Sequence, residues 1–132
     1  MYGASTKGNT ILQWCNIDNS IIDYAAERNP DKYGAMTLGT NIPIISEADS
    51  RAMNPDYYLV LPWHFKAEFL EREKETLEKG IGLIFPLPKI EIYKNNSQES
   101  VIILMTEGFI WKLFCLFLIR RSNVVFMNSG KM

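Results

Sequence analysis

The fold of this chain is indicated by its opening stretch, Gly3-Ala4-Ser5-Thr6-Lys7-Gly8-Asn9-Thr10, which runs directly into the apolar-periodic segment Ile11-Leu12-Gln13-Trp14-Cys15. Glycines at the start of a helix let backbone N–H groups come close to a phosphate, so the stretch predicts a nucleotide site. The alternative is a strand-to-helix turn that needs glycine only for its backbone angles. A Walker P-loop has lysine directly after its second glycine, whereas this chain has Asn9 there. NTPase chemistry is therefore not expected.

Composition and charge predict one ordinary globular domain without a surface for nucleic acid. The chain has 132 residues, of which 47% are hydrophobic and 22% charged. Its formal net charge is −1, and no basic cluster is interleaved with aromatic residues, so we expect no nucleic-acid partner. Cys15 and Cys115 lie in apolar surroundings, where a free thiol behaves as a small hydrophobe, and the N-terminus shows no secretory signal. These features favour a cytoplasmic protein.

Apolar runs alternate with helical patterns along the chain, which predicts an α/β fold with a Rossmann-like parallel sheet and flanking helices. We expect strands at residues 21–26, 57–61, 81–85 and 90–93, and helices at 9–16, after the capping box 46–49, and at 65–79. Pro86 and Pro88 place the last of these strands at an edge of the sheet or outside it. Residues 28–43 are rich in turn formers and predict a long loop, a type of segment that often carries function.

The charged residues of the predicted helix 65–79 are interpreted as a solvated face. Glu68 with Arg72 and Glu75 with Lys79 have the i,i+4 spacing of weak helix ion pairs. We assign this helix no function.

The sheet is expected to lack its first strand. A glycine turn of this kind normally follows a buried strand, yet only Met1 and Tyr2 precede Gly3. That strand is central in a doubly wound sheet. Two apolar segments, residues 101–105 and 124–127, have the length and character to enter the vacant position.

Several motifs follow one another in the first two-thirds of the chain. Besides the glycine turn they are Glu27-Arg28-Asn29-Pro30, Gly39-Thr40-Asn41-Ile42-Pro43-Ile44, Asn54-Pro55-Asp56-Tyr57 and Leu61-Pro62-Trp63. In this order and spacing, through about Tyr93, they resemble the C-terminal domain of sugar C-methyltransferases. We therefore divide the chain into a C-methyltransferase C-terminal-like domain over residues 1–93, truncated at its N-terminus, and an unmatched apolar tail over residues 94–132.

The resemblance implies a fragment of an S-adenosylmethionine-dependent enzyme with three parts. These are a zinc-binding N-terminal region, a methyl-donor domain, and a Rossmann-like C-terminal domain that helps to hold a nucleotide-sugar substrate. It implies S-adenosylmethionine for the whole enzyme, not bound by this chain, and zinc only for the missing N-terminal region. The family's catalytic histidine and glutamate precede this domain, so no catalytic residue is assigned here. The missing methyl-donor domain is the expected partner, and the chain alone is not expected to be active.

Candidate substrate-binding residues lie where the expected strands end, because ligands of open α/β sheets bind outside the carboxyl ends of strands. We expect them to converge on one cleft; they are Gly3, Lys7, Gly8, Asn9, Arg28, Lys32, Gly39, Thr40, Trp63 and His64. A helix N-terminus contributes only about 0.3–1 kcal/mol toward an exposed anion, so Lys7, Arg28 or Lys32 must add positive charge. We therefore expect weak affinity for the ligand. Trp63 can stack on a base or belong to the core. His64 can hydrogen-bond a phosphate or ribose or be structural.

The apolar tail supports a second hypothesis. The chain would then be a non-catalytic protein, membrane-associated or bound to a partner through its tail. Residues 101–119 approach membrane-crossing length, but Thr106-Glu107-Gly108 and Lys112 interrupt them, so a membrane anchor is the less favoured interpretation. The tail composition is also typical of out-of-frame translation of AT-rich DNA.

Overall fold

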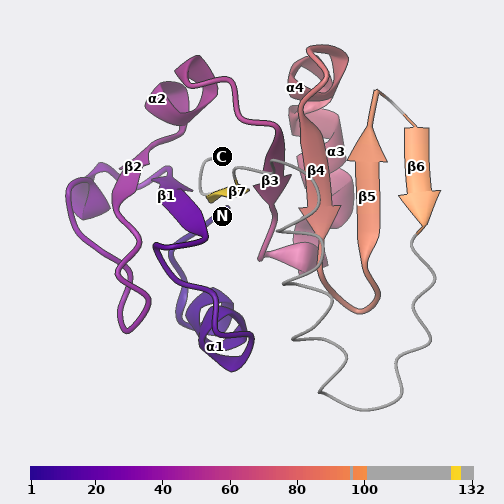
Figure 1. Cartoon of the computed structure of the whole chain (residues 1–132). Helices are drawn as coiled ribbons and strands as arrows, with labels where there is room; N and C mark the ends of the chain where they lie inside the picture. The colour runs from indigo at the N-terminus through magenta and orange to yellow at the C-terminus, as the bar shows by residue number, and fades with distance from the viewer. Residues whose placement is uncertain (96, 101–125, 129–132) are drawn as a thin grey trace.

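A computed structural model of the chain describes residues 1–95, 97–100 and 126–128 (Figure 1). Its helices are α1 (Thr6–Trp14), α2 (Glu47–Ala52), α3 (Lys66–Arg72) and α4 (Lys74–Glu78), with 3-10 turns η1 (Pro30–Lys32) and η2 (Trp63–Phe65). Its strands are β1 (Ile22–Glu27), β2 (Ile44–Ser46), β3 (Tyr57–Leu59), β4 (Gly82–Phe85), β5 (Glu91–Lys94), β6 (Ser97–Ser100) and β7 (Phe126–Asn128). Among the described residues the strands form one sheet in the order β2-β1-β7-β3-β4-β5-β6.

The sheet is parallel from β2 to β4 and antiparallel from β4 to β6. The parallel sheet with flanking helices confirms the predicted α/β fold class. The antiparallel part has a simple cause: only residues 86–90 join β4 to β5, whereas a parallel crossover needs a dozen residues or more. The prediction that the segment 90–93 is at an edge or outside the sheet is wrong, because β5 lies between β4 and β6.

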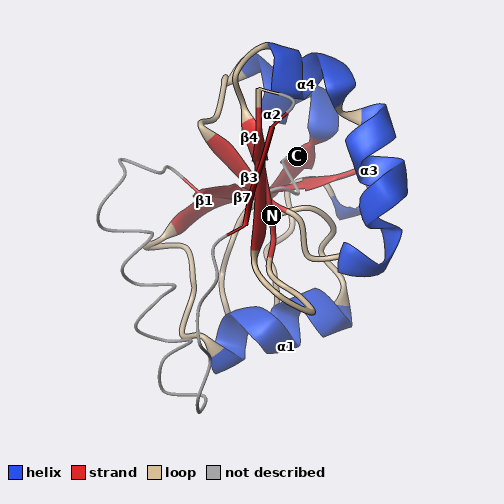
Figure 2. Ribbon diagram, turned by 90° about the vertical axis from the view of Figure 1, so that its right-hand side faces the viewer, coloured by secondary structure: helices blue, strands red, loops and turns tan. Residues whose placement is uncertain are grey.

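Helices cover both faces of the sheet, and β3 with the residues after it supplies side chains to each face. Leu59 and Leu61 pack in one cluster with Leu12 of α1, while Tyr58 and Val60 pack in another with Phe69 of α3. Figure 2 shows the sheet nearly edge-on, with α3 and α4 along one side. A strand buried on both faces needs apolar residues at successive positions, which explains the nearly continuous apolar run at 57–61.

The position between β1 and β3 is occupied by two short pieces of chain. β7 pairs with both neighbours, and its last residue, Asn128, lies opposite Leu59. Tyr2 continues this strand position beyond β7, since it forms parallel β-bridges with Ala26 and Val60. The position expected to be vacant is thus filled by Tyr2 and by β7, which overlaps the candidate segment 124–127.

The other candidate segment, residues 101–105, and the apolar run 101–119 lie outside the described residues. Within the part of the chain that the structure describes, no helix has the length and apolar character needed to cross a bilayer.

Local signals fix the ends of the helices. The Ser46 hydroxyl accepts a hydrogen bond from the Asp49 amide at 3.0 Å, so the predicted capping box opens α2. The helix predicted over residues 65–79 is divided at Glu73, whose backbone departs from helical angles and whose side chain is buried. Gly80, at φ +84°, follows α4 at the position where glycine commonly ends a helix.

Candidate functional site

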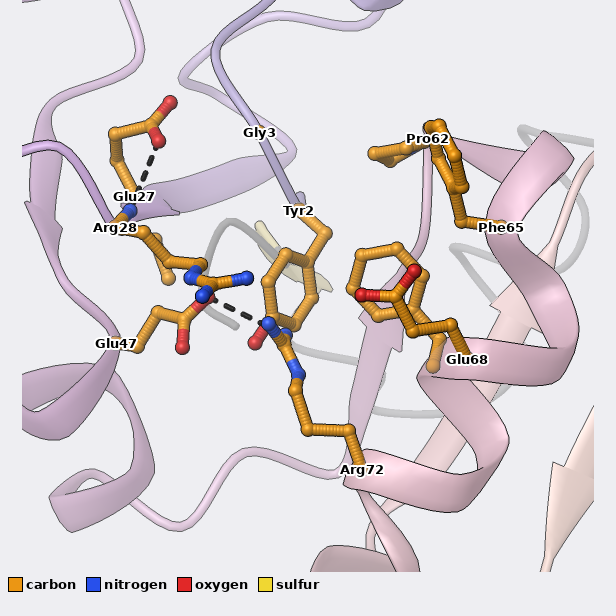
Figure 3. A pocket seen from close by; sticks show the side chains of 11 residues that line it. Tyr2, Gly3, Glu27, Arg28, Glu47, Pro62, Phe65, Glu68 and Arg72 are labelled. Carbon is orange, nitrogen blue, oxygen red and sulfur yellow. Dashed lines mark hydrogen bonds and ion pairs between the residues drawn. The ribbon is translucent and has the colours of Figure 1, made fainter.

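A pocket of about 300 Å³ opens at the carboxyl edge of the parallel strands, between the ends of β1 and β3 (Figure 3). The chain runs outward to β2 on one side of this point and to β4 on the other, so the pocket lies at the switch point where open α/β sheets bind ligands. Its lining combines an apolar wall with a charged rim. The wall is Tyr2, Ala26, Pro62, Phe65 and Phe69; Gly3 and the charged residues Glu27, Arg28, Glu47, Glu68 and Arg72 complete the lining.

The two glycines of the opening turn have different structural roles. Gly3 has φ +77° and turns the chain from the sheet into α1 beside the pocket. Gly8 is buried, and a Cβ added there would lie 2.8 Å from Cδ1 of Leu61. Gly8 therefore allows α1 to pack closely on the sheet, and it does not line the pocket.

Glu27, at the end of β1, ties together the loops on one side of the pocket. Its Oε2 accepts hydrogen bonds from the Ala4 amide at 3.1 Å and from Lys32 Nζ at 3.3 Å. Its Oε1 accepts from the amides of Arg28 at 2.9 Å and Asn29 at 3.3 Å. Burial alone would raise the pKa of Glu27, but these hydrogen bonds hold it below its ordinary value. The Glu27 carboxylate thus occupies the Ala4 amide, which belongs to the glycine-rich stretch predicted to bind a phosphate.

A second carboxylate, that of Glu73, lies behind the aromatic wall with 1% of its side chain exposed. It accepts hydrogen bonds from the hydroxyls of Tyr2 at 2.9 Å and Thr76 at 2.6 Å. It also pairs with Arg51 at 2.8 Å and Arg72 at 3.1 Å. This arrangement fixes Arg72 in the pocket lining.

Arg72 is held from several sides. Its guanidinium lies 4.5 Å from the ring centroid of Tyr2 and 4.7 Å from that of Phe69, and it pairs with Glu47 at 3.3 Å. Burial raises the pKa of Glu47 above its ordinary value; the charge of Glu73 adds to the rise, and the charges of Arg51 and Arg28 oppose it. The guanidinium of Arg72 is therefore largely committed to the fold.

The structure changes the interpretation of helix 65–79. The predicted pair of Glu68 with Arg72 is not among the ion pairs of the described residues, because Arg72 turns to Glu47 and Glu73 instead. Phe65, Glu68, Phe69 and Arg72 all line the pocket. Sequence reasoning missed these residues, although their spacing of three and four places them on one helix face.

The structure places only two of the ten predicted site residues, Gly3 and Arg28, in the pocket lining. Lys32 pairs with Glu27, and Lys7 is exposed on α1. Trp63 and His64 stack on each other with ring centroids 4.1 Å apart in η2, beside the pocket but outside its lining.

The expectation of a single cleft does not hold for the turn Gly39-Thr40. This turn precedes β2 and lies near the amino ends of the strands, where the Thr40 carbonyl accepts from the amide of Asn19, just before β1. The Thr40 hydroxyl donates to Asn9 Oδ1 at 3.2 Å and lies 2.5 Å from the hydroxyl of Thr37. Asn9 and Thr37 belong to a separate hollow of about 370 Å³ beside α1.

Metal ligands do not gather anywhere in the described part of the chain: no three His, Cys, Asp or Glu side chains there are placed to hold an ion. The pocket instead presents charged side chains that can form hydrogen bonds, and these lie beside aromatic rings.

Comparison with known proteins identifies the family. Residues 1–88, which include the whole pocket, match the model of the C-methyltransferase C-terminal domain. The chain is also 35% identical over 96 residues to the C-methyltransferase NovU of Streptomyces niveus. That match covers 73% of this chain and 23% of NovU, so the matched part spans less than a quarter of the relative's length. This chain belongs to the C-methyltransferase C-terminal domain family, as its sequence motifs predicted.

Proposed function

We propose that this domain holds the nucleotide-sugar substrate of an S-adenosylmethionine-dependent C-methyltransferase, while the methyl donor is bound by another part of the enzyme. The observation that carries the proposal is a pocket at the switch point of the sheet, with the guanidinium of Arg28 on its rim beside an aromatic wall. Phosphate needs a fork of donors, which arginine supplies in a planar geometry. A sugar needs hydrogen-bonding partners and an apolar surface.

Arg28 is the cation best suited to the diphosphate. No residue of the described chain forms an ion pair with its guanidinium, whereas Arg72 and Lys32 are each paired with glutamate. Two amides at the start of α1 already have acceptors within the chain. The Ala4 amide is bound by Glu27, and the Gly8 amide by the Ser5 hydroxyl at 3.1 Å.

Glu27 is not available to a ribose diol in this pocket, whether the ribose belongs to S-adenosylmethionine or to a nucleotide. In dinucleotide-binding Rossmann sites an acidic residue after the second strand accepts ribose hydroxyls. Glu27 holds the corresponding place, but each of its oxygens already accepts two hydrogen bonds. A carboxylate oxygen has two lone pairs in the plane, so no acceptor remains for a diol. S-adenosylmethionine would supply the methyl group from elsewhere, and this domain binds and orients the sugar nucleotide.

Nuclear magnetic resonance titration of the whole chain tests the proposal. Uridine or thymidine diphosphate glucose at millimolar concentration should shift the amides of Gly3 and Arg28, of Phe65 at the end of η2 and of Glu68 in α3. S-adenosylmethionine should give no saturable shifts. Shifts confined to the hollow at Asn9 and Thr37, or saturable binding of S-adenosylmethionine at micromolar concentration, would contradict it.

Two exposed cations provide a matched comparison. Arg28→Gln should weaken binding of the free diphosphates by about tenfold, the loss typical of one charge-assisted contact. Lys7→Gln changes an equally exposed cation at the start of α1, outside the pocket lining, and should leave the affinity unchanged. The opposite result would place the phosphate at the helix start.

A further inference from the structure

We propose that Glu68 and Arg28 bind opposite parts of one nucleotide sugar, with Arg28 on the diphosphate and the Glu68 carboxylate on sugar hydroxyls. This inference rests on the proposed function and deepens it, because it assigns an orientation to the substrate. It also makes Glu68 the residue that distinguishes a sugar nucleotide from a free nucleoside diphosphate.

Glu68 projects an uncommitted carboxylate into the pocket. Figure 3 shows its side chain extending from α3 over the aromatic wall. In the described chain its carboxylate takes part in no ion pair, because the cation one helical turn away, Arg72, is held by Glu47 and Glu73. The acceptor capacity of Glu68 is therefore available to a ligand.

Arg28 faces Glu68 from the opposite side of the pocket. The Arg28 amide is fixed by its hydrogen bond to Glu27, and the side chain extends from the end of β1 into the pocket (Figure 3). A ligand that lies between the two side chains meets a cation at one end and an anion at the other.

The wall between them suits a sugar ring. Phe65 is 58% exposed although it lines a pocket, which leaves its ring accessible to a ligand. Behind it Tyr2 and Phe69 pack edge to face, with centroids 4.6 Å apart. Aromatic side chains bury the apolar C–H face of a sugar while polar neighbours take its hydroxyls.

Charge then fixes the direction of the ligand. A diphosphate is repelled by a carboxylate and attracted by a guanidinium, so it lies at the Arg28 end. Sugar hydroxyls donate to an ionised carboxylate, which only accepts hydrogen bonds. The sugar therefore lies at the Glu68 end, beside Phe65.

The test compares uridine and thymidine diphosphates with their glucose conjugates on the full chain, by nuclear magnetic resonance titration. Glu68→Gln should weaken the glucose conjugates about three- to tenfold, the loss of a charge-assisted hydrogen bond near solvent, and leave or improve the affinity of the free diphosphates. Arg28→Gln should weaken both kinds of ligand. Glu71→Gln is the matched control, because Glu71 is on the same helix, 73% exposed and outside the pocket lining.

The outcomes separate this inference from the proposed function. If Glu68→Gln weakens both kinds of ligand equally, or neither, or behaves like Glu71→Gln, the assignment of Glu68 to the sugar is wrong while the nucleotide-sugar site stands. If the unaltered chain binds neither kind of ligand at millimolar concentration, the proposed function itself fails. Glu68 is exposed, so circular dichroism should show all three variants folded.

Discussion

Removal of the Glu73 carboxylate should destabilise the domain more than any change at its charged surface. Glu73 is 1% exposed and lies between α3 and α4, where one side chain gathers partners from three parts of the chain. Tyr2 comes from the central track of the sheet, Arg51 from α2 and Arg72 from α3. A change at Glu73 therefore loosens contacts between elements that are far apart in sequence.

The magnitude follows from what each substitution leaves behind. Glu73→Gln keeps an oxygen for Tyr2 and the two arginines and can donate to the Thr76 hydroxyl, so it loses mainly the charge, about 1–2 kcal/mol. Glu73→Ala removes the acceptor of two buried hydroxyls, those of Tyr2 and Thr76, and takes an anion away from two guanidinium groups, at a cost of about 3–5 kcal/mol. The side chains of Arg51 and Arg72 are 37% and 26% exposed, so water compensates part of their loss.

Urea unfolding followed by tryptophan fluorescence and circular dichroism measures both changes. A loss of 3–5 kcal/mol is a large share of a typical domain stability of about 5–15 kcal/mol, so Glu73→Ala should be marginal at 25 °C. The exposed control Glu71→Gln should stay within about 0.5 kcal/mol of the unaltered chain. If Glu73→Ala also stays within about 1 kcal/mol, the buried network does not hold these elements together.

Three further changes test other parts of the structure. Gly8→Ala gains about 1 kcal/mol of helix propensity, but its methyl group would lie 2.8 Å from Leu61 Cδ1, and overpacking of this kind costs about 1–3 kcal/mol. Urea unfolding should therefore show a net loss of stability. A gain in stability would contradict the close packing of α1 on the sheet. Glu27 and Glu91 both have pKa values below the ordinary 4.5, so the stability that they contribute is complete above that pH and is lost as the pH falls through the folded pKa values. Glu27→Gln should make the free energy of unfolding depend less steeply on pH below about pH 4.5. An unchanged pH dependence would refute this. Met127→Pro removes an N–H from β7 and should cost about 1–3 kcal/mol; an unchanged urea midpoint would show that β7 contributes nothing to stability.

The elements that the sequence predicted well are those whose determinants are local. The capping box at Ser46 and the apolar run at 57–61 each contain the whole physical reason for the structure they form. The glycine turn was predicted too, and Gly3 supplies its positive φ. The antiparallel direction of β5 was not predicted, although its cause is local too, since a connection of five residues is too short for a parallel crossover.

Most of the pocket was not predicted, because the partners of its charged groups are distant in sequence. Glu68 and Arg72 have ideal helix spacing, yet two carboxylates from other places take the guanidinium. No pattern within the helix sequence indicates that Glu47 and Glu73 compete with Glu68 for Arg72. Glu27 shows the reverse case, because the chain's own carboxylate accepts from the Ala4 amide, in the stretch that the sequence suggested for a phosphate.

What distinguishes a binding group from a structural one here is unused hydrogen-bonding capacity. Glu27 and Glu73 are saturated by the fold, whereas Glu68 and the guanidinium of Arg28 are not. Two charge-assisted contacts of about 1.5–3 kcal/mol each must offset an association cost of at least about 4 kcal/mol. The net gain from these two contacts is at most about 2 kcal/mol. This domain should therefore bind a nucleotide sugar no more tightly than about millimolar, which corresponds to about −4 kcal/mol. Tighter binding requires contacts from outside the pocket, and a methyl-donor domain, which we propose as partner, would supply them because it would approach the same sugar to deliver a methyl group.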